Sequence, residues 1–350
     1  SLRYSSFYRC TNLIGVTIGG VTNIGMEAFS GCTRLATVTI SNSVTPIGSN
    51  AFDSCTSLAN VMIGNGVTSI GVFAFRSCTS LKRVDVPDSV ARINDYAFQD
   101  CGGMTNAVIG NGVINIGLAA FAYCTGLTSI TIGNGVTNIG QSIFYNCTGL
   151  SNIAIPDSVR SIGDYAFRYC NNLLSATIGS GVTSIGLQAF EGCSRLNGVY
   201  FRGNAPPNVG TGIFTDAINV IVYYIFGTAG WPTVPDTWFG RPTALWNIAS
   251  LSINPPSTNY TSTATTGRTI GVSANVAWTA ASNVSWIAIT GGASGSGNGT
   301  VTFSVATNSA TSRTGGLVVA GGGISLTCTV VQAGATASLA ISPSSTNLTS

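Results

Sequence analysis

The chain has 350 residues, of which 45% are hydrophobic and only 7% are charged, and its formal net charge is +3. This apolar content excludes a disordered chain, and the few cations are too scattered for the dense basic stripe of a nucleic-acid-binding protein. The sequence contains no histidine, which excludes Ser-His-Asp and Cys-His catalytic sites and removes the usual zinc ligand.

A cysteine recurs through residues 1–200, first after 22 residues and then at steps of 23. A phenylalanine stands three residues before each of these cysteines, and a leucine or methionine stands three residues after it. A fixed period of this length indicates one supersecondary unit that stacks on copies of itself. The repeat cysteines are Cys10, Cys32, Cys55, Cys78, Cys101, Cys124, Cys147, Cys170 and Cys193.

Each period contains a predicted strand, a turn and a return segment. In the coil that begins at Cys124, residues 127–132 are short, β-branched and alternating at their end, which predicts a strand. Gly-Asn-Gly at 133–135, or Pro-Asp-Ser in other coils, predicts the turn. Residues 120–124 predict a short helical turn on the return side. Because one coil cannot bury its own apolar side chains, we expect a repeat solenoid with continuous core ladders.

We expect the repeat cysteines to form a ladder of buried free thiols. Stacked coils would bring neighbouring cysteine Cα atoms to about 5 Å, which lies within the disulfide range. However, side chains in such a ladder point the same way, and a ladder with an odd number of rungs cannot pair fully. A buried free cysteine behaves as a small hydrophobe. Some disulfides, and more remotely metal binding, remain alternatives. Cys328 alternates with Leu326 and Val330 and is also predicted to be buried.

The repeat pattern resembles a known family. Ala-Phe-x-x-Cys-Thr-x-Leu-x-x-Ile-x-Ile, as it stands at 120–132, is similar to the BspA-like class of bacterial leucine-rich repeats. The resemblance covers residues 1 to about 200, and about 246 with the cap. It implies a leucine-rich repeat array of the kind found in secreted or cell-surface proteins, which often adhere to host or matrix molecules. It does not identify a ligand.

Residues 201–248 are predicted to form a degenerate last coil and a C-terminal cap. Residues 209–214 echo the preceding coil, but Ala217 stands where a cysteine is expected. Terminal repeats are atypical because they must cover the open end of the core. Cap packing therefore explains the tryptophans of this segment, and sugar stacking by Trp231 or Trp238 is the alternative.

Residues 249–336 have no period and are rich in Ser, Thr, Gly and Val. Short alternating runs between Gly/Ser turns predict an all-β sandwich. The runs 277–287, 295–301 and 330–332, with Arg313-x-Gly315, resemble a BACON domain, a family with an immunoglobulin-like fold. The name of that family proposes carbohydrate binding, which makes Trp278 a further candidate for sugar stacking, although many members look like spacers.

Residues 337–350 are predicted to begin a second copy of this sandwich. The segment 250–262 matches 338–350 at 9 of 13 positions. We therefore expect the chain to be part of a longer protein, whose signal and anchor lie outside this sequence. No run of about 18 apolar residues, the length that spans a membrane, occurs in it.

The sequence favours a non-enzymatic, extracellular or cell-surface binding protein. Small neutral polar groups on a stiff sheet would suit a glycan or an extracellular protein ligand. The carboxylates fall mostly at turn positions such as Asp88 and Asp157, so turn chemistry explains them better than a glycosidase pair does. We predict no catalytic residue, cofactor or metal. The candidate ligand face, on outward strand positions, is Thr128, Ser129, Thr131, Ser151, Asn152, Ser175 and Thr177.

Other interpretations stay open. The same polar rows are what a merely solvated face requires. Low charge, a stiff array and tandem β modules also suit a spacer, or a self-associating segment of a stalk, sheath or filament, whose partners are copies of itself. Ice binding is disfavoured, because Met62 and Asp85 interrupt the row of threonines that a lattice match needs.

Overall fold

The structure, a computed structural model, describes residues 1–225, 227–246 and 250–335. The chain divides into two compact units, Ser1–Trp246 and Asn247–Ser350, which are described separately. The predicted second copy of the sandwich, 337–350, lies outside the described residues.

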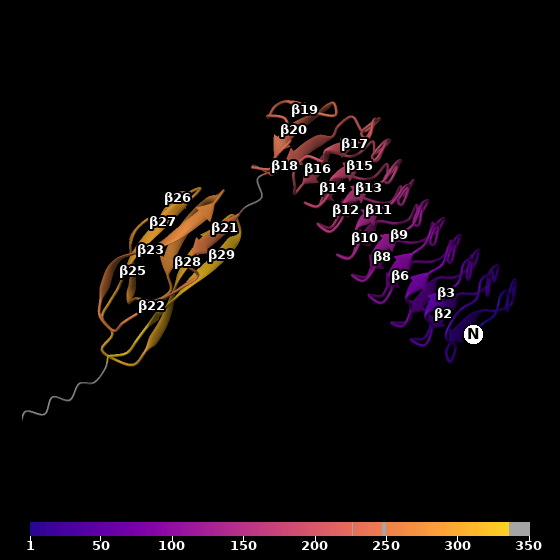
Figure 1. Ribbon diagram of the computed structural model, residues 1–350, viewed down its shortest axis with the longest axis horizontal. Coiled ribbons are helices and arrows are strands. Elements are labelled where there is room, and N and C mark those ends of the chain that lie inside the picture. Colours follow the sequence, from indigo (N-terminus) through magenta and orange to yellow (C-terminus); the bar gives the residue numbers. More distant parts are fainter. Residues whose placement is uncertain (226, 247–249, 336–350) are drawn as a thin grey trace, which may run out of the picture. The chain divides into compact units, whose positions relative to one another are not determined.

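The first unit is a solenoid of stacked coils (Figure 1). Each coil contributes one long strand, and these strands pair in parallel with their neighbours, as when Thr37 lies opposite Asn60 and Ile40 opposite Ile63. The pairing is interrupted once, between the strands at 129–131 and 152–154. The alternating apolar residues of each strand face inward, where the neighbouring coils cover them. The long strands are β1 (Gly15–Ile18), β2 (Thr37–Ile40), β4 (Asn60–Ile63), β6 (Arg83–Val86), β8 (Asn106–Ile109), β10 (Ser129–Thr131), β12 (Asn152–Ala154), β14 (Ser175–Ile178), β16 (Gly198–Phe201), β18 (Ile221–Tyr224) and β20 (Arg241–Leu245).

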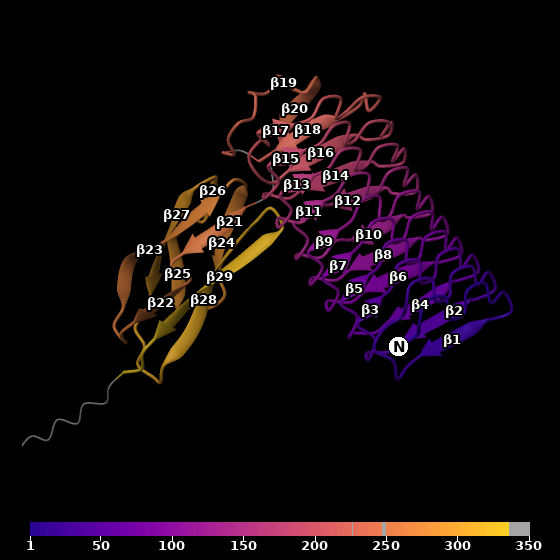
Figure 2. The ribbon, with the colours of Figure 1, turned by 45° about the vertical axis from the view of Figure 1, so that its right-hand side comes forward.

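A second row of strands follows the turn of each coil, and Figure 2 shows the two rows running along the solenoid. These strands are two residues long and also pair in parallel, with Ile70 opposite Ile93. They are β3 (Pro46–Ile47), β5 (Ser69–Ile70), β7 (Arg92–Ile93), β9 (Asn115–Ile116), β11 (Asn138–Ile139), β13 (Ser161–Ile162), β15 (Ser184–Ile185) and β17 (Asn208–Val209).

The return segment of each coil is a series of turns. We predicted a short helical turn here, but the described residues contain no helix. Two residues in each segment adopt positive φ, as Ala119 (51°) and Tyr123 (60°) do in one coil. Backbone N–H groups donate to the next coil instead of along a helix, and Phe98 N lies 2.8 Å from Ala120 O. Stacking therefore satisfies the backbone groups that a helix would have satisfied internally.

The core consists of ladders in which each coil repeats one residue type. The rings of Phe29 and Phe52, for example, stack with centroids 5.2 Å apart and planes 2° apart. Eight repeat cysteines are buried and free, and each thiol donates to the phenylalanine carbonyl of the preceding coil, as Cys124 Sγ does to Phe98 O at 3.2 Å. Burial raises the pKa of the Cys170 thiol to about 12.

Cys10 departs from the predicted ladder, because it is exposed. The other repeat thiols donate to a carbonyl of the preceding coil, and Cys10 makes no such bond among the described residues. The remaining repeat cysteines and Cys328 are buried and free, so no disulfide occurs among the residues that the structure describes.

Beyond β18, the end of the first unit is covered by a hairpin and a cluster of aromatic rings. Strand β19 (Thr237–Trp238) pairs antiparallel with β20. Trp238 packs against Phe201 and Phe214 at centroid distances of 5.4 and 6.4 Å. These contacts close the core where the regular repeat ends.

The second unit is a β-sandwich. One sheet has the order β21 (Leu251–Asn254), β23 (Thr265–Ala274), β27 (Gly299–Val305) and β25 (Ile287–Gly291). The other has the order β22 (Ser257–Tyr260), β29 (Ile324–Gln332), β28 (Arg313–Gly321), β24 (Ala277–Ser282) and β26 (Ser294–Ser296). The inward residues of both sheets, including Trp278, Phe303 and Cys328, form one apolar core.

The side-chain amide of Gln332 is the centre of a buried hydrogen-bond network that includes Arg313, a residue of the BACON-like pattern. Gln332 is fully buried, and its Nε2 donates to the carbonyls of Ser262 and Ala306 at 3.3 and 2.9 Å. Arg313 Nε donates to Gln332 Oε1 at 2.9 Å, and the Arg313 guanidinium lies 4.4 Å from the Trp286 ring centre. These residues tie the loops to the last strand, which is a structural role.

Candidate functional site

The long strands present two outward rows of side chains along the solenoid. In β6, Arg83 and Asp85 are exposed while Val84 and Val86 are buried. The outward positions of neighbouring strands are paired in register, with Asn152 opposite Ser175. We name this surface the long-strand face. It consists of the outward residues of the long strands, from β1 to β18, and of the residues that directly precede them. Its side chains can meet a ligand without disturbing the core.

The predicted ligand-face residues divide into two groups. Thr128, Ser129, Thr131 and Asn152 are exposed, whereas Ser151, Ser175 and Thr177 are half-buried. Several already bond to a neighbouring residue. Thr128 Oγ1 donates to Thr105 O at 2.9 Å, Ser175 Oγ to Asn152 Oδ1 at 2.7 Å and Asn152 Nδ2 to Ser151 Oγ at 3.2 Å.

Thr131 and Thr177 are brought together at one hollow of the long-strand face. The small side chain of Ala154 lies between them in the row, and Arg202 also lines the hollow, whose volume is about 250 Å³. Hydroxyl and guanidinium donors therefore converge around a small apolar floor.

An aromatic group that we did not predict lies at the C-terminal end of the same face. Tyr200 and Tyr223 occupy paired positions of β16 and β18, and their rings stack with centroids 4.6 Å apart and planes 6° apart. Trp246 tilts against Tyr200 at 5.2 Å. All three rings are half-buried, so part of each remains accessible. We name these three residues the aromatic platform.

A local feature of β16 holds the platform. A Cβ atom on Gly198 would come within 2.7 Å of the Tyr200 ring, so glycine leaves the space in which the ring lies. The sequence signal for the platform is the 23-residue spacing between Tyr200 and Tyr223. The coil of Tyr223 lacks the repeat cysteine, so the cysteine pattern alone does not align the two tyrosines.

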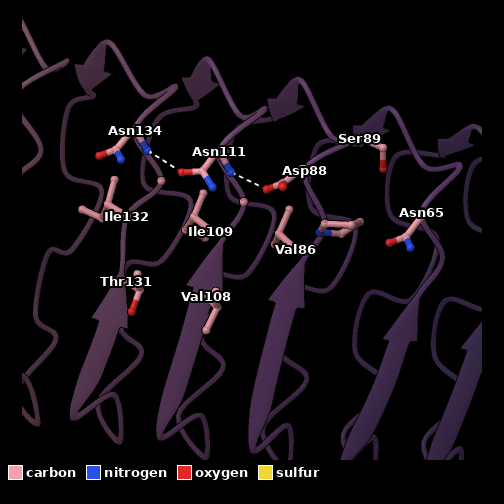
Figure 3. Close-up of a pocket in the computed structure, with 13 residues that line it drawn as sticks. Asn65, Val86, Asp88, Ser89, Val108, Ile109, Asn111, Thr131, Ile132 and Asn134 are labelled. Atoms are coloured by element: carbon pink, nitrogen blue, oxygen red, sulfur yellow. Dashed lines mark hydrogen bonds between the residues drawn. The ribbon is translucent and has the colours of Figure 1, made fainter. Parts of the chain in front are cut away.

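A second hollow, of about 650 Å³, follows the turns that end the long strands (Figure 3). Asp88, Asn111 and Asn134 come from successive turns and lie in one line along it. Asp88 Oδ1 accepts from Asn111 N at 2.6 Å, and Asn111 Oδ1 accepts from Asn134 N at 3.0 Å. Asp157 Oδ1 likewise accepts from Ser180 N at 2.7 Å. These side chains therefore join one turn to the next, as we expected of the turn carboxylates.

The structure does not support sugar stacking by the predicted tryptophans. Trp238 is 8% exposed in the cap, and Trp278 is 3% exposed in the sandwich core, with its Nε1 donating to Gly297 O at 2.8 Å. Trp231 is half-buried, stacks on Tyr224 at 5.1 Å and donates to Gly203 O at 3.2 Å. Trp231 and Trp238 thus pack in the cap, which was the first interpretation of the sequence, and Trp278 packs in the sandwich core.

No metal site occurs among the described residues, since no three Cys, Asp or Glu side chains gather to hold an ion. In the same part of the chain, no helix is long and apolar enough to cross a membrane.

Parallel strands stacked at a 23-residue period, with core ladders in which each coil repeats the same residue types, define a leucine-rich repeat solenoid. The family described as "BspA type Leucine rich repeat region (6 copies)" matches residues 1–128 and 91–221, which is more than half of the chain. The chain therefore belongs to this family. Residues 276–333 match the BACON family, described as "Putative binding domain, N-terminal". Both resemblances inferred from the sequence are thus confirmed.

Solved structures of bacterial leucine-rich repeat proteins are similar to the chain. One from Bacteroides ovatus is 26% identical, covers 60% of this chain and 63% of its own, and has a TM-score of 0.49. A leucine rich cell surface protein from Faecalibacterium prausnitzii is 29% identical, with coverages of 58% and 63% and a TM-score of 0.38. The T. pallidum leucine rich repeat protein is 29% identical, with coverages of 53% and 78% and a TM-score of 0.40.

The match spans less than two thirds of the length of the first two of these proteins. A search of curated proteins found no match.

Proposed function

We propose that the chain is a non-enzymatic binding protein that acts at the cell surface or outside the cell. In this proposal its long-strand face holds a glycan or an extracellular protein. The observation that carries the proposal is the presence, on one face, of neutral polar side chains such as Ser129, Asn152 and Ser175 together with the aromatic platform. Membership in the BspA type repeat family and the presence of a BACON domain support a binding role.

The chemistry of the face suits a neutral ligand. Hydroxyl and amide groups such as Ser129, Thr131 and Asn152 can exchange hydrogen bonds with sugar hydroxyls or with a peptide backbone. Further along the same face, the stacked pair Tyr200 and Tyr223 adds the partly accessible edges of two aromatic rings. Because the strands are held by the core ladders, little conformational entropy is lost when a ligand binds.

The test is binding of the full chain to immobilised glycans, mucin and matrix proteins, measured by biolayer interferometry. Two variants remove the proposed contacts, Tyr223→Ala on the platform and Thr131→Lys on the polar row. Tyr8→Ala is the matched control, because Tyr8 is 43% exposed in the first coil, outside the proposed contacts. We expect saturable binding that both face variants weaken and the control leaves unchanged. Equal binding by all variants would remove the long-strand face from the proposal.

The alternative is a structural role as a spacer or self-associating segment. Two large apolar side chains favour it, since Met62 is 67% exposed on the long-strand face and Ile114 is 50% exposed next to β9. Exposed apolar groups on a surface with few charges promote association. Sedimentation velocity of the same samples separates the two: particles that grow with concentration, without saturable binding, would support the structural role.

A further inference from the structure

The return side of the solenoid carries its own columns of side chains, one position from each coil. We name this surface the return face; it consists of the outward residues of the turns between each short strand and the next long strand. In one column, Phe73 and Tyr96 stack with centroids 4.8 Å apart and planes 14° apart. The next residue of that column is Ala119, so the stack stops there and the other side of the Tyr96 ring has no ring to pack against.

A second column has a small residue in the same coil. Its members are Gln99, Ala122 and Tyr145, so a large residue stands on either side of an alanine. Ala119 and Ala122 are only 6% and 1% exposed, because they form a floor rather than a projection. Because these two alanines stand where neighbouring coils have larger residues, they leave a hollow of about 290 Å³. This is close to the lower end of the volumes of ligand pockets, about 300–1,000 Å³.

Aromatic rings wall this hollow on both sides. Tyr96 forms one wall, and Tyr123 and Tyr145 form the other, where their rings lie 5.4 Å apart and are tilted by 56°. Tyr123 is 40% exposed, so this wall reaches into solvent. Tyr169 packs edge-on against Tyr145 at 5.7 Å and supports it from behind.

The polar groups at the hollow are neutral. Gln99, Gln141 and Ser142 line it, and the side-chain amides of the two glutamines have no hydrogen-bond partner within the described residues. In the two partly buried ion pairs of the return face, each arginine is already bound to a carboxylate. Arg76 Nε lies 2.8 Å from Asp53, and Arg168 Nε lies 2.8 Å from Glu191. The residues that line the hollow therefore offer amide and hydroxyl groups and carry no charge, and the group that follows Gln99 in the chain, the carboxylate of Asp100, is negative.

We propose that this hollow binds one pyranose ring of a neutral glycan. The C–H face of the sugar takes the place of the missing ring and packs on Tyr96, since the C–H groups are weakly positive and the ring face is negative. The amides of Gln99 and Gln141 meet the sugar hydroxyls. The absence of a charged lining group selects against anionic sugars. The site is on the return face, so it does not depend on the binding proposed for the long-strand face.

The repeat itself supplies the test variant. Ala119 has φ of 51°, and Tyr96 and Tyr165 hold the same repeat position at 57°. Ala119→Tyr therefore suits the backbone and fills the hollow with a ring that continues the stack on Tyr96. Gln188→Tyr is the matched control, because Gln188 holds the same repeat position, at φ of 52°, three coils away.

The probes are the methyl glycosides of glucose, galactose, mannose, xylose and N-acetylglucosamine, with methyl glucuronide as the anionic comparison. Binding to the full chain is measured by saturation-transfer NMR and titration calorimetry. We expect one or more neutral glycosides to bind, Ala119→Tyr to weaken that binding by more than about tenfold, and Gln188→Tyr to leave it unchanged. Thermal melting shows whether each variant folds, and Ala119→Tyr is expected to melt no lower than the wild type.

Three results would overturn the proposal. The first is no binding of any neutral glycoside by the wild-type chain. The second is binding that a folded Ala119→Tyr variant retains but Tyr223→Ala loses, which would locate the sugar on the long-strand face. The third is stronger binding of N-acetyltryptophanamide than of the glycosides at the same hollow, which would identify it as a site for peptide side chains. Loss of binding in Ala119→Tyr alone would support the proposal for the hollow, and the binding assay of the long-strand face would then be a separate test.

Discussion

Replacing Cys124 by aspartate tests whether the cysteine ladder lies in a dry core. The Cys124 side chain is 0% exposed, and its thiol has one polar partner, the carbonyl of Phe98 at 3.2 Å. A carboxylate placed there would face a carbonyl oxygen, which cannot donate a hydrogen bond to it. The introduced group would therefore be a buried charge without a partner, or would have to take up a proton.

Protonation sets the size of the effect. An unperturbed aspartate has a pKa near 3.9, so keeping it neutral at about pH 7 costs about 4 kcal/mol, at 1.36 kcal/mol for each pH unit. The pKa of the introduced group is raised in the folded state, so the loss of stability grows as the pH rises above 3.9 and fades as the pH falls toward it. Between about pH 7 and pH 4.5 the variant should regain about 3 kcal/mol relative to the wild type.

Urea unfolding of the full chain, followed by far-UV circular dichroism at both pH values, measures this difference. Cys124→Ser is the control, because a hydroxyl keeps a donor for Phe98 O and does not titrate. Subtracting the wild-type stability at each pH removes the contribution of the native carboxylates. Because each coil contacts only its neighbours, separate unfolding of the middle coils would appear as an early partial transition. A penalty under about 1 kcal/mol at neutral pH, or one that is equal at both pH values, would refute a dry ladder.

Three further predictions concern the accessibility of the cysteines and two sets of buried polar contacts. In native protein treated with iodoacetamide, mass spectrometry should find label on Cys10 alone, and on all ten cysteines after denaturation; native labelling of the ladder would contradict its burial. Gln332→Leu should destabilise the sandwich by about 3 kcal/mol, seen as a lower melting temperature, because several buried groups lose their partner. Arg76→Met should cost about 1–3 kcal/mol in urea unfolding, because Asp53 is nearly buried, whereas Arg83→Met should cost almost nothing, since its ion pair is exposed.

The sequence predicted the core of the solenoid because every core position is locked to the period. Phe121 and Cys124 recur with the same spacing in each coil, and only inward positions must keep the same residue type when coils stack. The sandwich has no period and was identified by short alternating runs, which correctly placed Cys328 in the core, whereas Trp278 was a sugar-stacking candidate and is buried. Inward and outward positions of a strand are distinguished by such alternation alone.

The return segment and the cap could not be predicted in the same way. Residues 120–124 fit a helical turn locally, but hydrogen bonds between coils replaced those of a helix, and a single coil carries no sign of them. The exposure of Trp231 and Trp238 depends on how the last coil folds back on the core. The other coils contain no equivalent segment from which this could be inferred. Only the three-dimensional contacts distinguish a ring that packs in the cap from a ring that is available to a ligand.

The sites that the structure adds are irregularities in otherwise regular columns. Tyr200 and Tyr223 are the two aromatic residues of a column that otherwise varies, and Ala119 and Ala122 interrupt two others. Because the ladders hold the backbone of every coil in nearly the same conformation, a change at an outward position alters the surface without moving its neighbours. A single substitution can thus create a platform or a hollow at a defined place. It follows that ligand specificity in such an array should be sought where one coil departs from the column, and that filling one such departure should remove one binding activity and leave the others intact.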